Sequence, residues 1–172
     1  MQRLGLWIAE GLGIGRIPVA PGTFGSLLGL VWFVALLETQ RFWLFVAGLL
    51  LGGAASVWLC HVGEKALGRK DPGSVVLDEI TALPVCFVPW IVKLWLPNHV
   101  LPTPSSFFGS KNWYWTAAIF TLFRIFDVTK PGPIRASQSL PGGWGVTVDD
   151  FLAAAAVALV TVPLLSYIGS AG

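Results

Sequence analysis

Charged residues are scarce in this sequence. Only 12% of its 172 residues are Asp, Glu, Lys or Arg, whereas 55% are hydrophobic and the mean hydropathy is +0.73. Soluble domains usually carry about twice this fraction of charge. The formal net charge of +2 is too small to indicate binding to nucleic acid. The composition therefore predicts a membrane protein, and the length suits one domain over residues 1–172.

Cysteine, histidine and the common catalytic motifs are also sparse. Cys60 and Cys86 form no CxxC pair and no metal-ligand spacing, so we expect neither a disulfide framework nor a zinc site. His61 ends one apolar segment and His99 follows the next, which predicts opposite sides of the membrane and excludes joint action. The sequence has no Asp-x-Asp phosphoaspartate signature, no G-x-S-x-G elbow and no GK[ST] ending of a P-loop. Among hydrolytic mechanisms, these absences favour a metal-activated water.

Five apolar segments are present, at residues 24–37, 42–60, 80–96, 113–126 and 151–168. A full helical span needs about 20 residues, which the second and fifth segments meet. The first and fourth are short enough to be tilted, re-entrant or extended by their polar flanks. The first fifteen residues lack the pattern of a signal peptide, so we expect insertion through the chain's own spans. The predicted fold class is an all-α polytopic membrane bundle with about five apolar segments.

Basic residues are distributed unequally between the two sides that these segments define. With a cytoplasmic N-terminus, the outer side holds only Arg41, Lys93 and Lys111. The inner side holds Arg3, Arg16, Lys65, Arg69, Lys70, Arg124, Lys130 and Arg135. This bias follows the positive-inside rule. It predicts a cytoplasmic face that carries these eight residues and an external loop at residues 97–110.

Five carboxylates share the predicted cytoplasmic ends of the segments. They are Asp78, Glu79, Asp127, Asp149 and Asp150. A helical bundle would bring them together, and their mutual repulsion would then raise their pKa values unless positive charge lay among them. Carboxylate oxygens without a nearby His or Cys cluster suit a hard cation such as Mg²⁺. We therefore expect these five acids to be both the metal ligands and the catalytic residues.

Local structural roles remain open for some of these acids. Thr147 to Asp150 fits a capping box ahead of the last apolar segment, and this interpretation is as well supported as a functional one. Arg124 and Asp127 are spaced to form a helical ion pair worth about 0.2–0.5 kcal/mol. Asp78 and Glu79 are adjacent, so on a helix they point about 100° apart and cannot both face water at a crowded bundle mouth. For this pair a functional role is favoured.

Other polar residues suit a phosphate group beside the metal. The stretch GLGIGRIPVAPGTFGS, residues 11–26, offers Arg16, Thr23 and Ser26 before an apolar helix, where backbone N–H groups are free to bind an anion. Its glycines alone indicate a turn and close helix packing. The stretch RIFDVTKPGPIR adds Arg124, Lys130 and Arg135, and the alternative for Lys130 is a positive-inside flank. The predicted phosphate ligands are Arg16, Thr23, Ser26, Arg124, Lys130 and Arg135.

Four blocks, in order, carry a family resemblance: PVAPGTFGS, DPGSVVLDE, RIFDVTKPGPIR and LPGGWGVTVDD. Together they resemble the phosphatidylglycerophosphatase A family over residues 11–154. The resemblance implies a helical, Mg²⁺-dependent bacterial enzyme of the inner membrane that converts phosphatidylglycerophosphate into phosphatidylglycerol. Carried over by position, it points to Thr23, Ser26, Asp78, Glu79, Arg124, Asp127, Lys130, Arg135, Asp149 and Asp150. Ala82, Thr147 and Ala154 depart from the family pattern, which affects helix approach more than chemistry.

The predicted function is thus a lipid phosphatase with its active site facing the cytoplasm and its phospholipid substrate in the inner leaflet. The alternative from another class is a small transporter or channel with a cytoplasmic acidic cation site. That alternative predicts acids at the membrane midplane or on both sides, whereas the outer side here has almost none. A lipid-headgroup transferase is disfavoured because the pattern D-x-x-D-G-x-x-A-R is absent.

Overall fold

A computed structural model describes residues 2–167, and within that range the chain is built from helices without strands. The α-helices are α1 (Gln2–Ala9), α2 (Pro21–Glu38), α3 (Phe42–Leu67), α4 (Leu77–Ala82), α5 (Val88–Trp95), α6 (Ser105–Phe108), α7 (Trp113–Thr129), α8 (Pro133–Ser137) and α9 (Gly143–Thr161). The short 3₁₀ helices are η1 (Gly11–Arg16), η2 (Leu83–Phe87) and η3 (Val162–Ser166). The all-α prediction is confirmed.

Three helices in the described range are long and apolar enough to cross a membrane: Pro21–Glu38, Phe42–Leu67 and Gly143–Ser166. The expectation of about five segments is therefore not confirmed. Residues 80–96 are divided among α4, η2 and α5, where Pro84 and Pro89 each remove a backbone N–H donor. Helix α7 has 17 residues, and Ile168, the predicted end of the last segment, lies outside the described residues.

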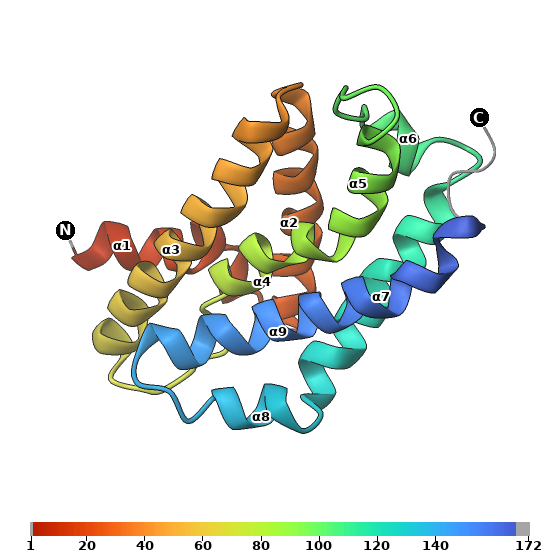
Figure 1. The fold of residues 1–172 in the computed structure, drawn as a ribbon. Coiled ribbons are helices and arrows are strands. Elements are labelled where there is room, and N and C mark those ends of the chain that lie inside the picture. Colours follow the sequence, from red (N-terminus) through yellow and green to blue (C-terminus); the bar gives the residue numbers. More distant parts are fainter. Residues whose placement is uncertain (1, 168–172) are drawn as a thin grey trace.

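The longer helices are arranged around a short central unit made of α4, η2 and α5 (Figure 1). Helix α2 stands upright, α3 slants away from the turn that joins it to α2, and α4, η2 and α5 run beside α2. Helix α9 lies crosswise in front of them, with α8 below it. Aromatic rings fill the core: Phe33 stacks on Phe87 with ring centroids 4.5 Å apart, and Trp90 meets Phe107 edge-on at 4.7 Å. These contacts join α2 to η2 and α5 to α6.

Small residues let α2 approach α4 closely. A Cβ atom added at Gly25 would lie 2.7 Å from Cβ of Val76, and one added at Gly29 would lie 3.0 Å from Cβ of Leu83. Neither distance leaves room for a larger residue without movement of the partner. The prediction of close helix packing in the stretch 11–26 is confirmed at Gly25, and Gly29 continues the same close approach beyond that stretch.

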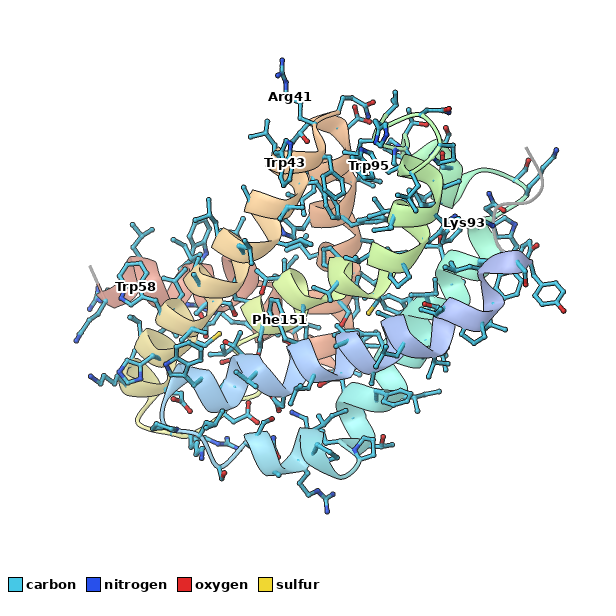
Figure 2. The ribbon with its side chains drawn as sticks, viewed as in Figure 1. Arg41, Trp43, Trp58, Lys93, Trp95 and Phe151 are labelled. Atoms are coloured by element: carbon cyan, nitrogen blue, oxygen red, sulfur yellow. The ribbon has the colours of Figure 1, made fainter. Side chains whose placement is uncertain are left out.

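The turn between α2 and α3 and the end of α5 lie at the end of the molecule opposite α8 (Figures 1 and 2). Arg41, Trp43 and Trp95 gather there, and Phe42 stacks on Trp95 with centroids 4.3 Å apart. Tryptophan is typical of membrane interfaces. Arg41, which the predicted topology puts on the outer side, thus lies at the end of the molecule away from α8.

Candidate active site

Three carboxylates from two helices meet in the interior. Asp78 and Glu79 occupy the first turn of α4, and Asp150 lies inside α9. Each offers a ligand oxygen, and these oxygens all lie within 4.8 Å of one another. Asp78 and Asp150 are only 5% and 2% exposed. The crossing of α9 over α4 therefore brings together acids that are far apart in the sequence.

Several oxygens of this cluster lack partners. Asp78 Oδ1, Glu79 Oε2 and Asp150 Oδ2 are buried and have no hydrogen-bond partner among residues 2–167. Burial and the neighbouring charge of Glu79 raise the pKa of Asp78 well above its ordinary value, and burial raises the pKa of Glu79 to about 6. Buried carboxylates without partners are costly unless a cation compensates them. The oxygen-only donor set fits a hard cation such as Mg²⁺.

The other two predicted acids have basic partners. Nη1 of Arg124 lies 2.5 Å from Oδ2 of Asp127, so the helical ion pair expected from the sequence is confirmed. Lys130 Nζ donates a hydrogen bond to Asp149 and lies 3.9 Å from Oδ1 of Asp127. The five acids thus divide into three whose ligand oxygens converge and two that hold cations, and Oδ1 of Asp149 is also buried without a hydrogen-bond partner among residues 2–167.

Arg124 also connects this second group to the first. Its Nη1 lies 4.0 Å from Oε1 of Glu79 and donates a hydrogen bond of 3.1 Å to Ser26 Oγ, 98 residues away in the sequence. Ser26 is fully buried and donates in turn to the carbonyl of Gly22 at 2.8 Å. The guanidinium group is therefore held beside the carboxylate cluster from two sides.

Lys130, the residue that caps the C-terminal end of α7, has an uncommon backbone conformation. Its φ of 44° lies in the left-handed region, which is strained for a residue with a side chain. Burial opposes its charge, but the hydrogen bond to Asp149 and the charges of the nearby aspartates raise its pKa above the ordinary value. A cavity of about 530 Å³ adjoins this position, and Lys130 and Arg135 are among the residues that line it. Lys130 and Arg135 therefore border a space in which a phosphate group fits.

Gly22 is a site residue that the sequence did not reveal. A Cβ atom there would lie 2.3 Å from Oε1 of Glu79 and 3.0 Å from Nη2 of Arg124. A larger residue there would displace the ends of these two side chains, so glycine lets α2 begin against this pair in its observed arrangement. The glycine stands within the block APGTFGS, but nothing in that block indicates which side chain it faces.

Two predicted phosphate ligands have no contact with the cluster in the described part of the chain. Arg16 forms an ion pair with Glu10, with Nη2 2.6 Å from Oε2. Thr23 is partly buried in the first turn of α2, and its side chain makes no hydrogen bond to the five acids among residues 2–167. Their binding roles stay predictions.

The capping-box interpretation of Thr147 and Asp150 is wrong. Helix α9 begins at Gly143, so Thr147 lies inside the helix, and its Oγ1 lies 3.2 Å from Oγ of Ser56 on α3. Asp150 is consequently a buried interior residue rather than a first-turn acid. The helix begins at Gly143, ahead of the apolar segment 151–168 at which its start was expected.

Comparison with known sequences decides the family. Residues 7–165 match the family described as phosphatidylglycerophosphatase A. The chain belongs to the phosphatidylglycerophosphatase A family. This confirms the resemblance seen in the four sequence blocks, and it places the chain in a family of lipid phosphatases with membrane helices.

Three curated relatives are similar over most of their length. Phosphatidylglycerophosphatase A of Escherichia coli (strain K12) is 34% identical over 164 residues, covering 94% of this chain and 81% of the relative. The Haemophilus influenzae protein of the same name is 36% identical over 148 residues, covering 86% and 80%. A Bacteroides thetaiotaomicron protein, provisionally named a phosphatidylinositol-3-phosphatase, is 36% identical over 151 residues, covering 85% and 84%. No solved structure matches the chain significantly.

Proposed function

We propose that this family member hydrolyses the terminal phosphomonoester of phosphatidylglycerophosphate in a reaction that depends on Mg²⁺. The products would be phosphatidylglycerol and inorganic phosphate. The observation that carries the proposal is the position of Arg124 beside three converging carboxylates with unpartnered oxygens, with Lys130 held by Asp149 next to Asp150 in the sequence. A cation site next to fixed positive side chains is suited to a doubly charged phosphate.

Asp78, Glu79 and Asp150 would hold the metal. Bound Mg²⁺ would supply positive charge against the phosphate oxygens and favour ionisation of water. Asp127 and Asp149 would act differently from the other acids, because each already holds a cation. They would orient Arg124 and Lys130 toward the substrate.

The chain's own residues would carry the rest of the reaction. Arg124, supported by Ser26, and Lys130 would bind the phosphate oxygens and stabilise the charge that develops on them. A carboxylate of the site would accept a proton as the water oxygen bonds to phosphorus. The bond from phosphorus to the glycerol oxygen would break, and that oxygen would take the proton back from the carboxylate and leave as the alcohol. Arg135, which lines the adjoining cavity, would guide the incoming phosphate.

A membrane lipid is the substrate class that the surroundings favour. The chain has helices suited to a bilayer, and the cations Lys65, Arg69 and Lys70 lie in and just after the last turn of α3, at the end remote from Arg41 and Trp43. By the positive-inside rule, this end would face the cytoplasm of the bacterial inner membrane and the inner leaflet would supply the substrate. The transporter alternative gains no support from the relatives, which carry phosphatase names.

A substrate panel tests the proposal. Purified protein in detergent with Mg²⁺ is given phosphatidylglycerophosphate, its water-soluble headgroup and phosphatidylglycerol, and phosphate release is measured. Hydrolysis of the lipid monoester should exceed that of the soluble headgroup, because binding of the acyl chains helps position the phosphate. The diester should stay intact. Equal rates on the lipid and on its soluble headgroup would contradict the proposal.

The name of the Bacteroides relative favours one further substrate in this panel. Phosphatidylinositol 3-phosphate is also a lipid phosphomonoester, so the same cation site and basic residues would suit it. A higher kcat/KM on this lipid than on phosphatidylglycerophosphate would replace the proposed substrate and leave the proposed chemistry in place.

A further inference from the structure

A second basic region lies away from the carboxylate cluster. The last turn of α3 and the residues after it form one wall of a cavity of about 370 Å³, and the segment that leads into α9 forms the other. Lys65, Arg69 and Lys70 line it, together with His61. Glu64 is the acid among the lining residues, and its Oε1 accepts a hydrogen bond from the backbone N–H of Asp71 at 3.0 Å. The charge of this cavity is therefore predominantly positive.

An apolar groove continues from this basic cavity. It has a volume of about 350 Å³ and is lined by Ala54, Val57, Trp58 and Trp144, among others. Both spaces are bordered by the same three residues, His61, Pro141 and Gly142. Trp58 and Trp144 are 66% and 56% exposed, so the rim of the groove presents large apolar surface. On α3, Trp58 lies well away from the Arg41 end (Figure 2).

Close contacts fix the wall that the two spaces share. A Cβ atom at Gly142 would lie 2.4 Å from Nδ1 of His61, and one at Gly143 would lie 1.9 Å from the carbonyl oxygen of Val57. Lys70 Nζ donates a hydrogen bond of 2.7 Å to the carbonyl of Gln138. The segment before α9 is thus held against α3, and the basic cavity and the groove keep their relative positions.

We propose that these two spaces form a binding site for an anionic phospholipid, separate from the active site. The phosphodiester would lie among Lys65, Arg69 and Lys70, and an acyl chain would follow the groove between Trp58 and Trp144. Cations at a membrane surface attract anionic lipid, and tryptophan favours the same interfacial depth. A soluble phosphate would use only the basic cavity, whereas a lipid also uses the adjoining apolar groove. None of the five acids of the active site lines either space.

Photolabelling of the purified full-length protein tests this site without measuring hydrolysis. The probe is phosphatidylglycerol with a diazirine in its acyl chain, in neutral detergent micelles, and phosphatidylcholine with the same chain is the comparison. Labelled residues are mapped by peptide mass spectrometry. We expect phosphatidylglycerol to label the peptides that contain Trp58 or Trp144. The variant K65A/R69A/K70A should reduce this labelling at least about tenfold.

Two control variants separate the site from general surface charge and from the active site. R41A/K111A removes exposed cations elsewhere and should leave the labelling of the groove unchanged. K130A alters the active site and should also leave it unchanged. Thermal unfolding in detergent checks that each variant is folded, and for a triple variant that fails to fold the single variants R69A and K65A replace it.

Three results would overturn the proposal. They are equal labelling of the groove by phosphatidylcholine, unchanged labelling in the folded charge variants, and loss of labelling in K130A while Lys65, Arg69 and Lys70 are intact. Competition identifies the ligand class: unlabelled phosphatidylglycerol should reduce the labelling, and excess inorganic phosphate should not. Full displacement by inorganic phosphate would instead assign the basic cavity to a soluble anion.

Discussion

The ammonium group of Lys130 at the end of α7 donates a hydrogen bond to the carboxylate of Asp149, which is completely buried in α9. The pair joins the helix that carries Arg124 and Asp127 to the helix that carries Asp150. It therefore links the predicted phosphate-binding group to the predicted metal-binding group.

Replacing Lys130 with Met should destabilise the protein, because the Asp149 carboxylate would stay buried without its cation. Loss of one partner of a buried ion pair costs about 3–5 kcal/mol, and we expect the low end because the Lys130 side chain is 21% exposed. Thermal unfolding in detergent measures the change. The double variant Lys130→Met with Asp149→Asn should regain most of the stability but not the activity. Additive losses in the double variant would show that the two side chains are not energetically coupled.

Gly22→Ala should lower phosphatase activity while the protein remains folded. The added Cβ would lie 2.3 Å from Oε1 of Glu79, so it would displace the end of a side chain in the active site rather than backbone. Gly73→Ala is the matched control, because a Cβ atom there meets nothing within 4 Å. Activity and thermal unfolding are measured for both. Equal activity in the two variants would mean that the position of Glu79 beside α2 is not required.

Added Mg²⁺ should stabilise the protein more at about pH 7.5 than at about pH 5. Burial raises the pKa of Glu79 to about 6 and that of Asp78 well above its ordinary value. Raised carboxyl pKa values mean that the metal-free fold loses stability as pH rises through that range, when these groups ionise. Mg²⁺ at a hundredfold excess over its Kd would return about 2.7 kcal/mol at the higher pH.

Thermal unfolding in detergent, with and without Mg²⁺, measures this stabilisation and also identifies the residues that bind the metal. Asp78→Asn and Asp150→Asn should remove the stabilisation by Mg²⁺, whereas Glu38→Gln, at an exposed acid at the far end of α2, should keep it. Stabilisation that is unchanged in both ligand variants would place the metal elsewhere.

Cysteine labelling tests the proposed orientation. In a background with Cys60→Ala and Cys86→Ala, single cysteines at Arg69 and Arg135 should react from the cytoplasmic side, and one at Ser110 from the outer side. All three positions are exposed, so access to the reagent depends on the side of the membrane. Labelling of Ser110→Cys and Arg69→Cys from one side would exclude the proposed topology.

The sequence predicted the convergence of the acids because each stands at the polar end of an apolar segment. It did not predict that residues 80–96 are divided among α4, η2 and α5. Hydropathy alone does not show that the prolines in this apolar segment break it into short helices. The ion pair between Arg16 and Glu10 was also not anticipated from the sequence, and the phosphate-binding role of Arg16 stays a prediction. The role of Gly22 depends on a contact between α2 and α4, and such a contact leaves no periodic signal in one sequence.

Phosphate release from phosphatidylglycerophosphate by the wild-type protein and by Asp78→Asn, each with Mg²⁺ and with excess chelator, tests the proposed metal site most directly. The substitution preserves the shape of the side chain and removes one carboxylate from the cluster. We expect activity only in the wild-type protein with Mg²⁺, and a loss of at least about a hundredfold in Asp78→Asn. Wild-type activity that survives complete chelation, or near-normal turnover by Asp78→Asn at saturating Mg²⁺, would contradict the account of this site.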